Sequence, residues 1–262
     1  MYKLVIVLVF SGFAQAEVLD LHLMGQRDQA PLYYHRLLQE SLQAEGKSVK
    51  IILAPEMPLL RIYKLLDSGE LSAHWFLQTA ERDKRFLRVS VPLSFGLIGQ
   101  RLLLVKKGQA EPYTKIKNLA DLQASNKRAG MAQGWFDVMV WKANQLPVYE
   151  QVGDWRVLFK LAGAKNRGID YLPRGAIEIL DDFSQYPGLE IEPNLLLSYE
   201  RDFVFYVSPH YPQLRDQIER ALQAALASGL QRRLFDQLIL PKVKSLNLNK
   251  RTVIQLNSSF KE

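Results

Sequence analysis

Hydrophobic and polar positions along the first third of the chain predict strands that alternate with helices. Leucines occupy every second position over residues 18–24, which is typical of a strand with one buried face. Over residues 57–66 the leucines recur at helical spacing instead. The predicted order is strand 18–24, helix 32–44, strand 49–53, helix 57–66 and strand 73–77. This alternation predicts a mostly parallel sheet with covering helices.

The segment from residue 78 to residue 108 predicts a short polar helix, an extended stretch and then an apolar strand. Thr79 is placed to cap a helix with Glu81 in its first turn and basic residues in its second. Pro92 prevents the helix from continuing. The apolar run 102–105 ends abruptly in Lys-Lys-Gly, so we expect a strand that leaves one globular unit for another.

After residue 108 the pattern restarts, which indicates a second lobe. The predicted elements are helix 119–123, strand 127–132, helices 135–145 and 155–164, strand 168–172, helix 176–183 and strand 203–207. Helices follow from residue 209, and residues 252–256 form a β-like run. We expect residues 17–104 and 206–262 in the first lobe, residues 109–200 in the second, and hinges near 105–108 and 201–205.

Several segments resemble type II periplasmic solute-binding proteins, in particular the extracellular solute-binding protein family 3. The first-lobe segments are Thr79-Ala80-Glu81-Arg82, Val89-Ser90-Val91-Pro92 and the strand 102–105. The second-lobe segments are Asn118-Leu119-Ala120-Asp121-Leu122, Arg128-Ala129-Gly130-Met131 and Gln133-Gly134. The resemblance implies a two-lobed α/β fold with a mixed, mostly parallel sheet in each lobe and two hinge crossings.

The resemblance also implies a ligand site between the lobes. In that family the arginine at the position of Arg82 clamps the ligand's carboxylate, and its planar guanidinium suits that role. The alternative is that Arg82 is a solvated residue of a polar helix. The helix start after Gln133 and Gly134 would present free amide groups to the ligand. Arg82, Thr79, Gln133 and Gly134 are therefore candidate ligand-binding residues.

Other candidate positions depart from the family pattern. Trp135 stands where small or hydroxyl residues are usual, and it can stack on a flat ligand or anchor the core. Residues 167–175 resemble the later ligand strand with Asp170, but the position expected to be acidic falls near Arg174. Arg174 favours an anionic solute as a second clamp, or is an ion-paired residue at a strand end. Arg27 lies in a polar loop beyond the first strand, where open sheets bind ligands.

The amino terminus predicts export. Lys3, the apolar run 4–10 and Ala14-Gln15-Ala16 are typical of a secretory signal peptide cleaved after Ala16. No later stretch approaches the length of about 18 apolar residues that a membrane helix needs. The chain contains no cysteine, which excludes disulfides and thiolate chemistry. We expect a periplasmic, monomeric mature protein that starts at Glu17.

Charge and motifs narrow the function further. The net charge of +7 favours anionic ligands or an anionic membrane surface, and the export signal argues against nucleic acid. The four histidines show no metal-binding spacing, and no nucleophile or phosphate-binding motif occurs. We therefore expect no catalytic residue, metal or cofactor.

The sequence thus predicts an exported protein that captures a small polar, carboxylate-bearing solute for an ABC permease or a membrane sensor. Two alternatives remain open. One is an enzyme of the same fold, such as a dehydratase acting on a small cyclic carboxylic acid, with Glu178 or Asp170 as general acid. The other is a scaffold that has kept the fold and lost its ligand.

Overall fold

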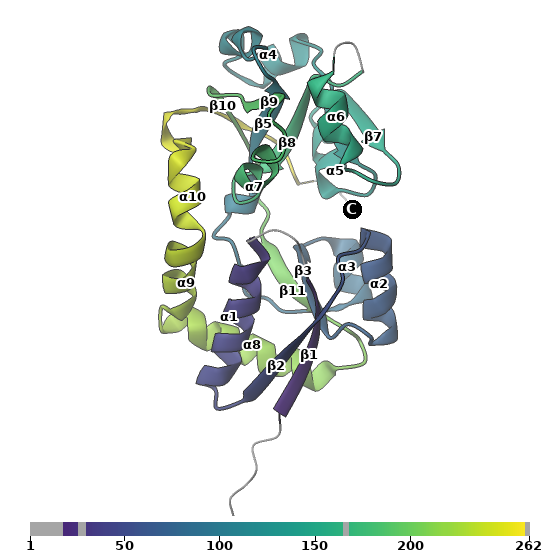
Figure 1. Ribbon diagram of the computed structural model, residues 1–262, viewed down its shortest axis with the longest axis vertical. Helices are drawn as coiled ribbons and strands as arrows, with labels where there is room; N and C mark the ends of the chain where they lie inside the picture. Colours follow the sequence, from purple (N-terminus) through teal and green to yellow (C-terminus); the bar gives the residue numbers. More distant parts are fainter. Residues whose placement is uncertain (1–17, 26–29, 165–167, 260–262) are drawn as a thin grey trace, which may run out of the picture.

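A computed structural model describes residues 18–25, 30–164 and 168–259 of the chain, and it shows two lobes (Figure 1). The expected signal-peptide cleavage site and Arg27 lie outside the described residues. Within those ranges, no helix has the length and apolar content that crossing a membrane requires.

The first lobe, at the bottom of Figure 1, is built on β1 to β4 and β11. Its strands are β1 (Val18–Met24), β2 (Ser48–Ala54), β3 (Ala73–Leu77), β4 (Leu87–Arg88) and β11 (Phe203–Val207). β1 and β2 are parallel, whereas β11 pairs antiparallel with both β3 and β4. Leu21 and Leu23 of β1 are fully buried while His22 between them is exposed, as the alternating pattern predicts.

Five helices cover these strands: α1 (Ala30–Ala44), α2 (Leu59–Ser68), α3 (Ala80–Arg85), α8 (Pro212–Ala227) and α9 (Leu230–Leu238). Both α8 and α9 contact α1. Residues at helical spacing along α8 form its buried face, namely Leu214, Ile218, Ala221, Leu222 and Ala225. These helices place the carboxyl end of β3 and the start of α3 on the side that faces the second lobe (Figure 1).

The second lobe is built on one mixed sheet in the order β12-β10-β5-β8-β6-β7, with β9 beside β5. The strands are β5 (Gln100–Lys106), β6 (Ala129–Ala132), β7 (Val148–Gln151), β8 (Tyr171–Gly175), β9 (Leu189–Ile191), β10 (Leu195–Ser198) and β12 (Thr252–Gln255). The helices are α4 (Leu119–Ala124), α5 (Phe136–Ala143), α6 (Val157–Gly163), α7 (Ile179–Phe183) and α10 (Leu240–Ser245). Short 3-10 helices span Leu97–Gly99, Glu111–Lys115 and Leu248–Lys250.

Strand pairing corrects the expected boundaries of the lobes. β5 pairs with β8, β9 and β10, so residues 100–106 lie inside the second-lobe sheet and are not a crossing. The apolar run 102–105 is buried because its strand has neighbours on both sides. The chain passes between the lobes earlier, between β4 and β5, and returns between β10 and β11. β12, expected in the first lobe, pairs in parallel with β10 of the second.

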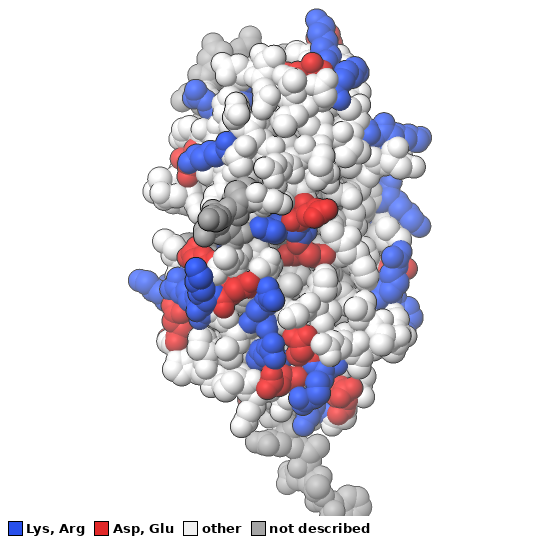
Figure 2. All heavy atoms as spheres, turned by 180° about the vertical axis from the view of Figure 1, so that it is seen from behind, with Lys and Arg blue, Asp and Glu red and all other residues white. Residues whose placement is uncertain are grey.

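The charged side chains are not segregated on the face shown in Figure 2. Basic and acidic residues lie interspersed there, most densely over the lower half of the molecule. The net charge of +7 therefore does not form a single basic patch on this face, so this face gives no support to binding of an anionic polymer or membrane.

Candidate functional site

Arg82 lies in the first turn of α3, the helix that follows β3. Thr79 caps α3, because its Oγ1 accepts a hydrogen bond from the Arg82 backbone N at 3.2 Å. The Arg82 side chain turns back beneath this cap. Its Nε donates to the Tyr63 hydroxyl at 2.7 Å and its Nη1 donates to the Leu77 carbonyl at 2.6 Å. Arg82 is only 7% exposed, so it is not a solvated helix residue.

The charge of Arg82 has aromatic neighbours instead of a carboxylate. Its guanidinium carbon lies 5.1 Å from the ring centre of Phe76 and 5.8 Å from that of Tyr63. No carboxylate of the described residues forms an ion pair with it, whereas Arg85 of the same helix pairs with Asp67 at 2.5 Å. A buried cation without a counter-ion is costly, and a site that receives an anion offsets that cost. Arg82 is therefore a candidate to bind an anion.

Two histidines of the first lobe, His35 and His74, add no positive charge at neutral pH. Burial, followed by the charges of His35 and Arg82, lowers the pKa of His74 to about 3. Burial likewise lowers the pKa of His35. The Tyr34 hydroxyl, His35 Nε2 and His74 Nδ1 are buried and have no hydrogen-bond partner within the described part of the chain.

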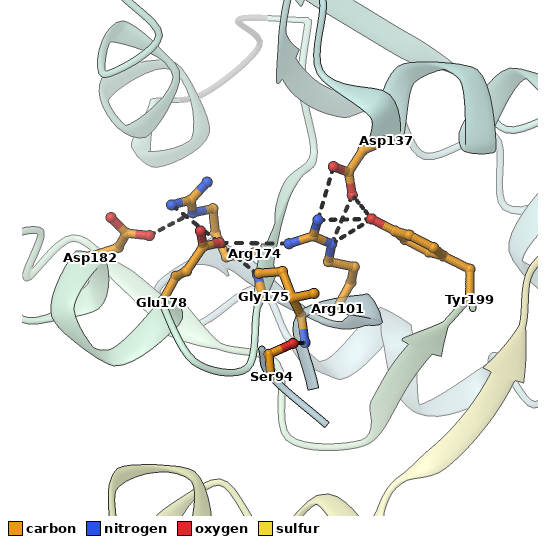
Figure 3. A network of polar contacts seen from close by, with 9 residues as sticks. Ser94, Arg101, Asp137, Arg174, Gly175, Glu178, Asp182 and Tyr199 are labelled. Atoms are coloured by element: carbon orange, nitrogen blue, oxygen red, sulfur yellow. Dashed lines mark hydrogen bonds and ion pairs between the residues drawn. The ribbon is translucent and has the colours of Figure 1, made fainter. Parts of the chain in front are cut away.

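The second lobe contains a buried ionic network (Figure 3). Arg101 of β5 pairs with Asp137 of α5 through two contacts, Nε to Oδ1 at 2.8 Å and Nη2 to Oδ2 at 3.0 Å. The Tyr199 hydroxyl donates to Asp137 Oδ1 at 2.8 Å and accepts from Arg101 Nη2 at 2.8 Å. Burial lowers the pKa of Arg101, whereas the charges of Asp137, Tyr199 and Glu178 raise it. The second effect is larger, so the pKa of Arg101 lies above its ordinary value.

Arg174 is an ion-paired residue at the end of β8. Its Nε contacts Asp182 Oδ2 at 2.5 Å, and its Nη2 lies 3.6 Å from Glu178 Oε2. Its guanidinium carbon also lies over the rings of Trp135 and Trp155, at 5.2 and 4.8 Å from their centres. Because Asp182 and Glu178 already neutralise the guanidinium, the geometry does not favour Arg174 as a second clamp for an anion.

Among the other predicted residues, Trp135 lies beside Arg174 and directly follows Gln133 and Gly134, whereas Asp170 lies apart from them. Gln133 and Gly134 are exposed at the start of α5, and Gly134 has a φ of +82°, which favours glycine. Trp135 is half-buried and packs against the core and the Trp155 ring, which fits the core-anchor reading. Asp170 precedes β8, and its Oδ2 accepts from the Arg128 backbone N at 2.7 Å. At about 3.3 Å per strand residue it lies roughly 13 Å from Arg174, at the other end of the strand.

The sequence did not indicate the residues that hold this network together, which are Arg101, Asp137, Tyr199, Glu178 and Asp182. Glu178 was named only as a possible general acid. Arg101 carried a signal, since a charged residue that opens an apolar strand needs a buried partner. Asp137 carried a weaker one, as an acidic residue among apolar ones at a helix start. The contacts of Arg101 with Asp137 and Tyr199 could not be predicted, because these residues lie 36 and 98 positions away from it in the sequence.

One ion pair joins the lobes at the side opposite α9 and α10. Arg156, at the start of α6, contacts Glu56 in the loop before α2. Two pockets lie on outer surfaces of the described structure, and neither includes Arg82 or Arg174. One pocket runs along α2, and the other is lined by residues of α3, β4 and α8. The described residues contain no cluster of metal ligands.

No protein-family model and no curated protein sequence matches the chain. Solved structures do match. They include an ancestral arginine-binding protein bound to arginine, at 18% identity and a TM-score of 0.59, covering 84% of this chain and 97% of that one. An ancestral amino-acid-binding protein described as a precursor of cyclohexadienyl dehydratase matches at 14% identity and a TM-score of 0.60, covering 85% and 95%.

A third match comes from work on glutathione import through GshT and the cystine ABC importer of Streptococcus mutans. It has 16% identity and a TM-score of 0.60, and it covers 85% of this chain and 95% of that chain. At such identities the likeness establishes architecture, and it agrees with the two lobes and two crossings described above. The chain has the two-lobed fold of the type II periplasmic binding proteins.

Proposed function

We propose that this chain is an exported solute-binding protein that holds a small carboxylate-bearing solute between its lobes, with Arg82 as the carboxylate ligand. The observation that carries the proposal is the state of three arginines, of which Arg82 and Arg101 are buried and Arg174 is 12% exposed. Arg101 and Arg174 of the second lobe are each held by an aspartate. Arg82 of the first lobe is buried without one and has hydrogen-bond partners that orient its guanidinium.

The second lobe favours a solute that also carries a positive charge. Two arginines and three carboxylates of the network in Figure 3 leave one formal negative charge. Glu178 is the most exposed of these five side chains, at 28%. Burial raises the pKa of Tyr34 in the first lobe, and the charge of Glu178 adds to that rise. A zwitterion could place its carboxylate on Arg82 and its ammonium near Glu178. We therefore favour an amino-acid-like solute over a dianion.

This proposal also gives the chain a place in a pathway of capture and delivery. A two-lobed protein that closes on a solute presents a different surface when it is loaded, which an ABC permease or a membrane sensor can recognise. The similar structures include a binding protein bound to arginine or to glutamine, and one from work on a cystine ABC importer. Their ligands share the carboxylate and ammonium groups proposed for this site.

A thermal-shift screen of amino acids, dicarboxylates and cyclic carboxylic acids on the mature protein tests the proposal. We expect at least one zwitterion to raise the melting temperature, and dicarboxylates to give a smaller rise. A Glu178→Gln variant should reduce the response to the zwitterion more than the response to a dicarboxylate. A screen in which no compound raises the melting temperature would contradict binding and favour the scaffold alternative.

Export is a separate prediction. The protein purified from the periplasm of an expressing Gram-negative cell should have an intact mass that starts at Glu17, as cleavage after Ala16 requires. Replacing Ala14 and Ala16 by bulky residues should retain the uncleaved precursor at the membrane, because signal peptidase needs small residues there. An unprocessed chain in the soluble cytoplasmic fraction would contradict export.

A further inference from the structure

The C-terminal part of the chain runs alongside both lobes. In Figure 1, α9 and α10 form a column at one side of the molecule, and the segment after α10 turns into the second lobe as β12. We call residues 230–258 the strap. The strap is separate from the two crossings that precede β5 and follow β10.

The lower end of the strap is fixed to the first lobe. α9 packs against α1, and the Phe235 ring meets the Tyr33 ring edge-on with 5.5 Å between centres. Gln231 is fully buried, and its Nε2 donates to the Pro92 carbonyl at 2.7 Å. Burial of an aromatic ring and a paired amide makes α9 part of the first-lobe core.

The upper end of the strap is fixed to the second lobe at several independent points. Lys242 of α10 pairs with Asp181 of α7 at 2.7 Å, and Leu246 packs into the second-lobe core. β12 hydrogen-bonds to β10 over four residues. Beyond it, Asn257 and Asn144 form a reciprocal pair, with the Asn257 backbone N donating to Asn144 Oδ1 at 2.9 Å and Asn144 Nδ2 donating to the Asn257 carbonyl at 2.8 Å.

Between these anchors the strap contains a break between two helices, where it can bend. α9 ends at Leu238 and α10 begins at Leu240, so Ile239 lies between the two helices with φ −110° and ψ −50°. Pro241 follows, and proline has no backbone N–H to continue the hydrogen-bond ladder of α9. The chain between the two anchors is only a few residues long.

We propose that the strap is a third connection between the lobes, which limits how far they open and confines the remaining motion to bending near Ile239. A fold with two crossings closes about one hinge axis. A third connection at the side of the molecule reduces how far the lobes can rotate about that axis. The consequence is a narrow range of lobe separations even without ligand, so the inference can be tested independently of the proposed solute.

The test measures the distance between the lobes. Because the chain has no cysteine, Lys64→Cys in α2 and Lys160→Cys in α6 allow two nitroxide labels at exposed positions opposite the strap. Double electron–electron resonance on the ligand-free protein should give one narrow distance distribution. Inserting about six Gly and Ser residues between Leu240 and Pro241 adds up to roughly 20 Å of reach while keeping both anchors. The distribution should then broaden and shift to longer distances.

A matched control separates release of the strap from general loosening. The same insertion in the exposed turn at Gly46, after α1, should leave the distance distribution unchanged. A milder variant, Lys242→Gln, removes one second-lobe anchor and should broaden the distribution less than the insertion. If the parent distribution is already broad, or if the strap insertion leaves it unchanged in a protein that melts normally, the strap does not restrict opening.

Discussion

Arg82→Gln is expected to abolish the thermal stabilisation that a bound solute gives to the parent protein. A glutamine amide cannot supply the charged, two-pronged contact that a guanidinium makes with a carboxylate. Loss of one partner of a buried charged pair costs about 2 to 5 kcal/mol of binding free energy, or roughly thirtyfold to several thousandfold in affinity. The measurement is the shift in melting temperature with and without the best solute from the screen.

The variant should also lower the stability of the empty protein, because Arg82 donates hydrogen bonds to Tyr63 and Leu77. Leaving those buried acceptors unsatisfied costs about 1 to 3 kcal/mol. The readout is therefore the ligand-dependent shift and not the melting temperature itself. Arg85→Gln is the matched control, since Arg85 lies on the same helix but is 38% exposed and pairs with Asp67. A shift in Arg82→Gln as large as in Arg85→Gln would rule out the clamp.

Asp137→Ala is expected to be the most destabilising single substitution that we predict. It leaves Arg101, which is 4% exposed, without the carboxylate that contacts two of its nitrogens. Removing one member of a buried ion pair costs about 3 to 5 kcal/mol, which corresponds to a fall of about 6 to 20 °C in melting temperature for a chain of this size. Urea unfolding of parent and variant, compared at equal m-value, measures the loss.

Two further variants show whether the loss comes from a stranded charge. Arg101→Met combined with Asp137→Leu removes both charges and should recover much of the stability lost in Asp137→Ala, because apolar groups replace the pair. Asp216→Ala breaks an exposed ion pair with Arg215 and should cost less than about 1 kcal/mol. If the double variant is no more stable than Asp137→Ala, lost packing and not charge explains the effect.

Features set by neighbouring residues could be predicted from the sequence. The Thr79 cap and the short helix after it depend on a hydroxyl, an acidic first turn and basic residues within a few positions. The β1 strand could be predicted because its leucines alternate with polar residues. Each of these signals depends on residues that are close together in the chain, so no knowledge of the tertiary fold is needed.

Features that depend on partners far away in the sequence could not be predicted. A strand that leaves a lobe and a strand inside a sheet can have the same apolar sequence, as in β5. Only the pairing of β5 with β8, β9 and β10 shows that it lies inside a sheet. The run 252–256 was recognisably extended, but nothing local indicates β10 as its neighbour. Arg174 was identified as an unusual cation, yet its neutralisation by Asp182 depends on how α7 folds back after β8.

The position of β12 in the second-lobe sheet has a consequence for how the protein acquires its structure. That sheet takes strands from two separated stretches of the chain, residues 100–198 and 252–255, and its edge beside β10 is completed only by the second stretch. Such long-range pairing forms slowly, because the intervening chain must first be brought together. During synthesis the second lobe therefore remains incomplete until residues 252–255 have left the ribosome. For a chain that we propose to be exported, this delay favours threading through a translocation channel in an unfolded state.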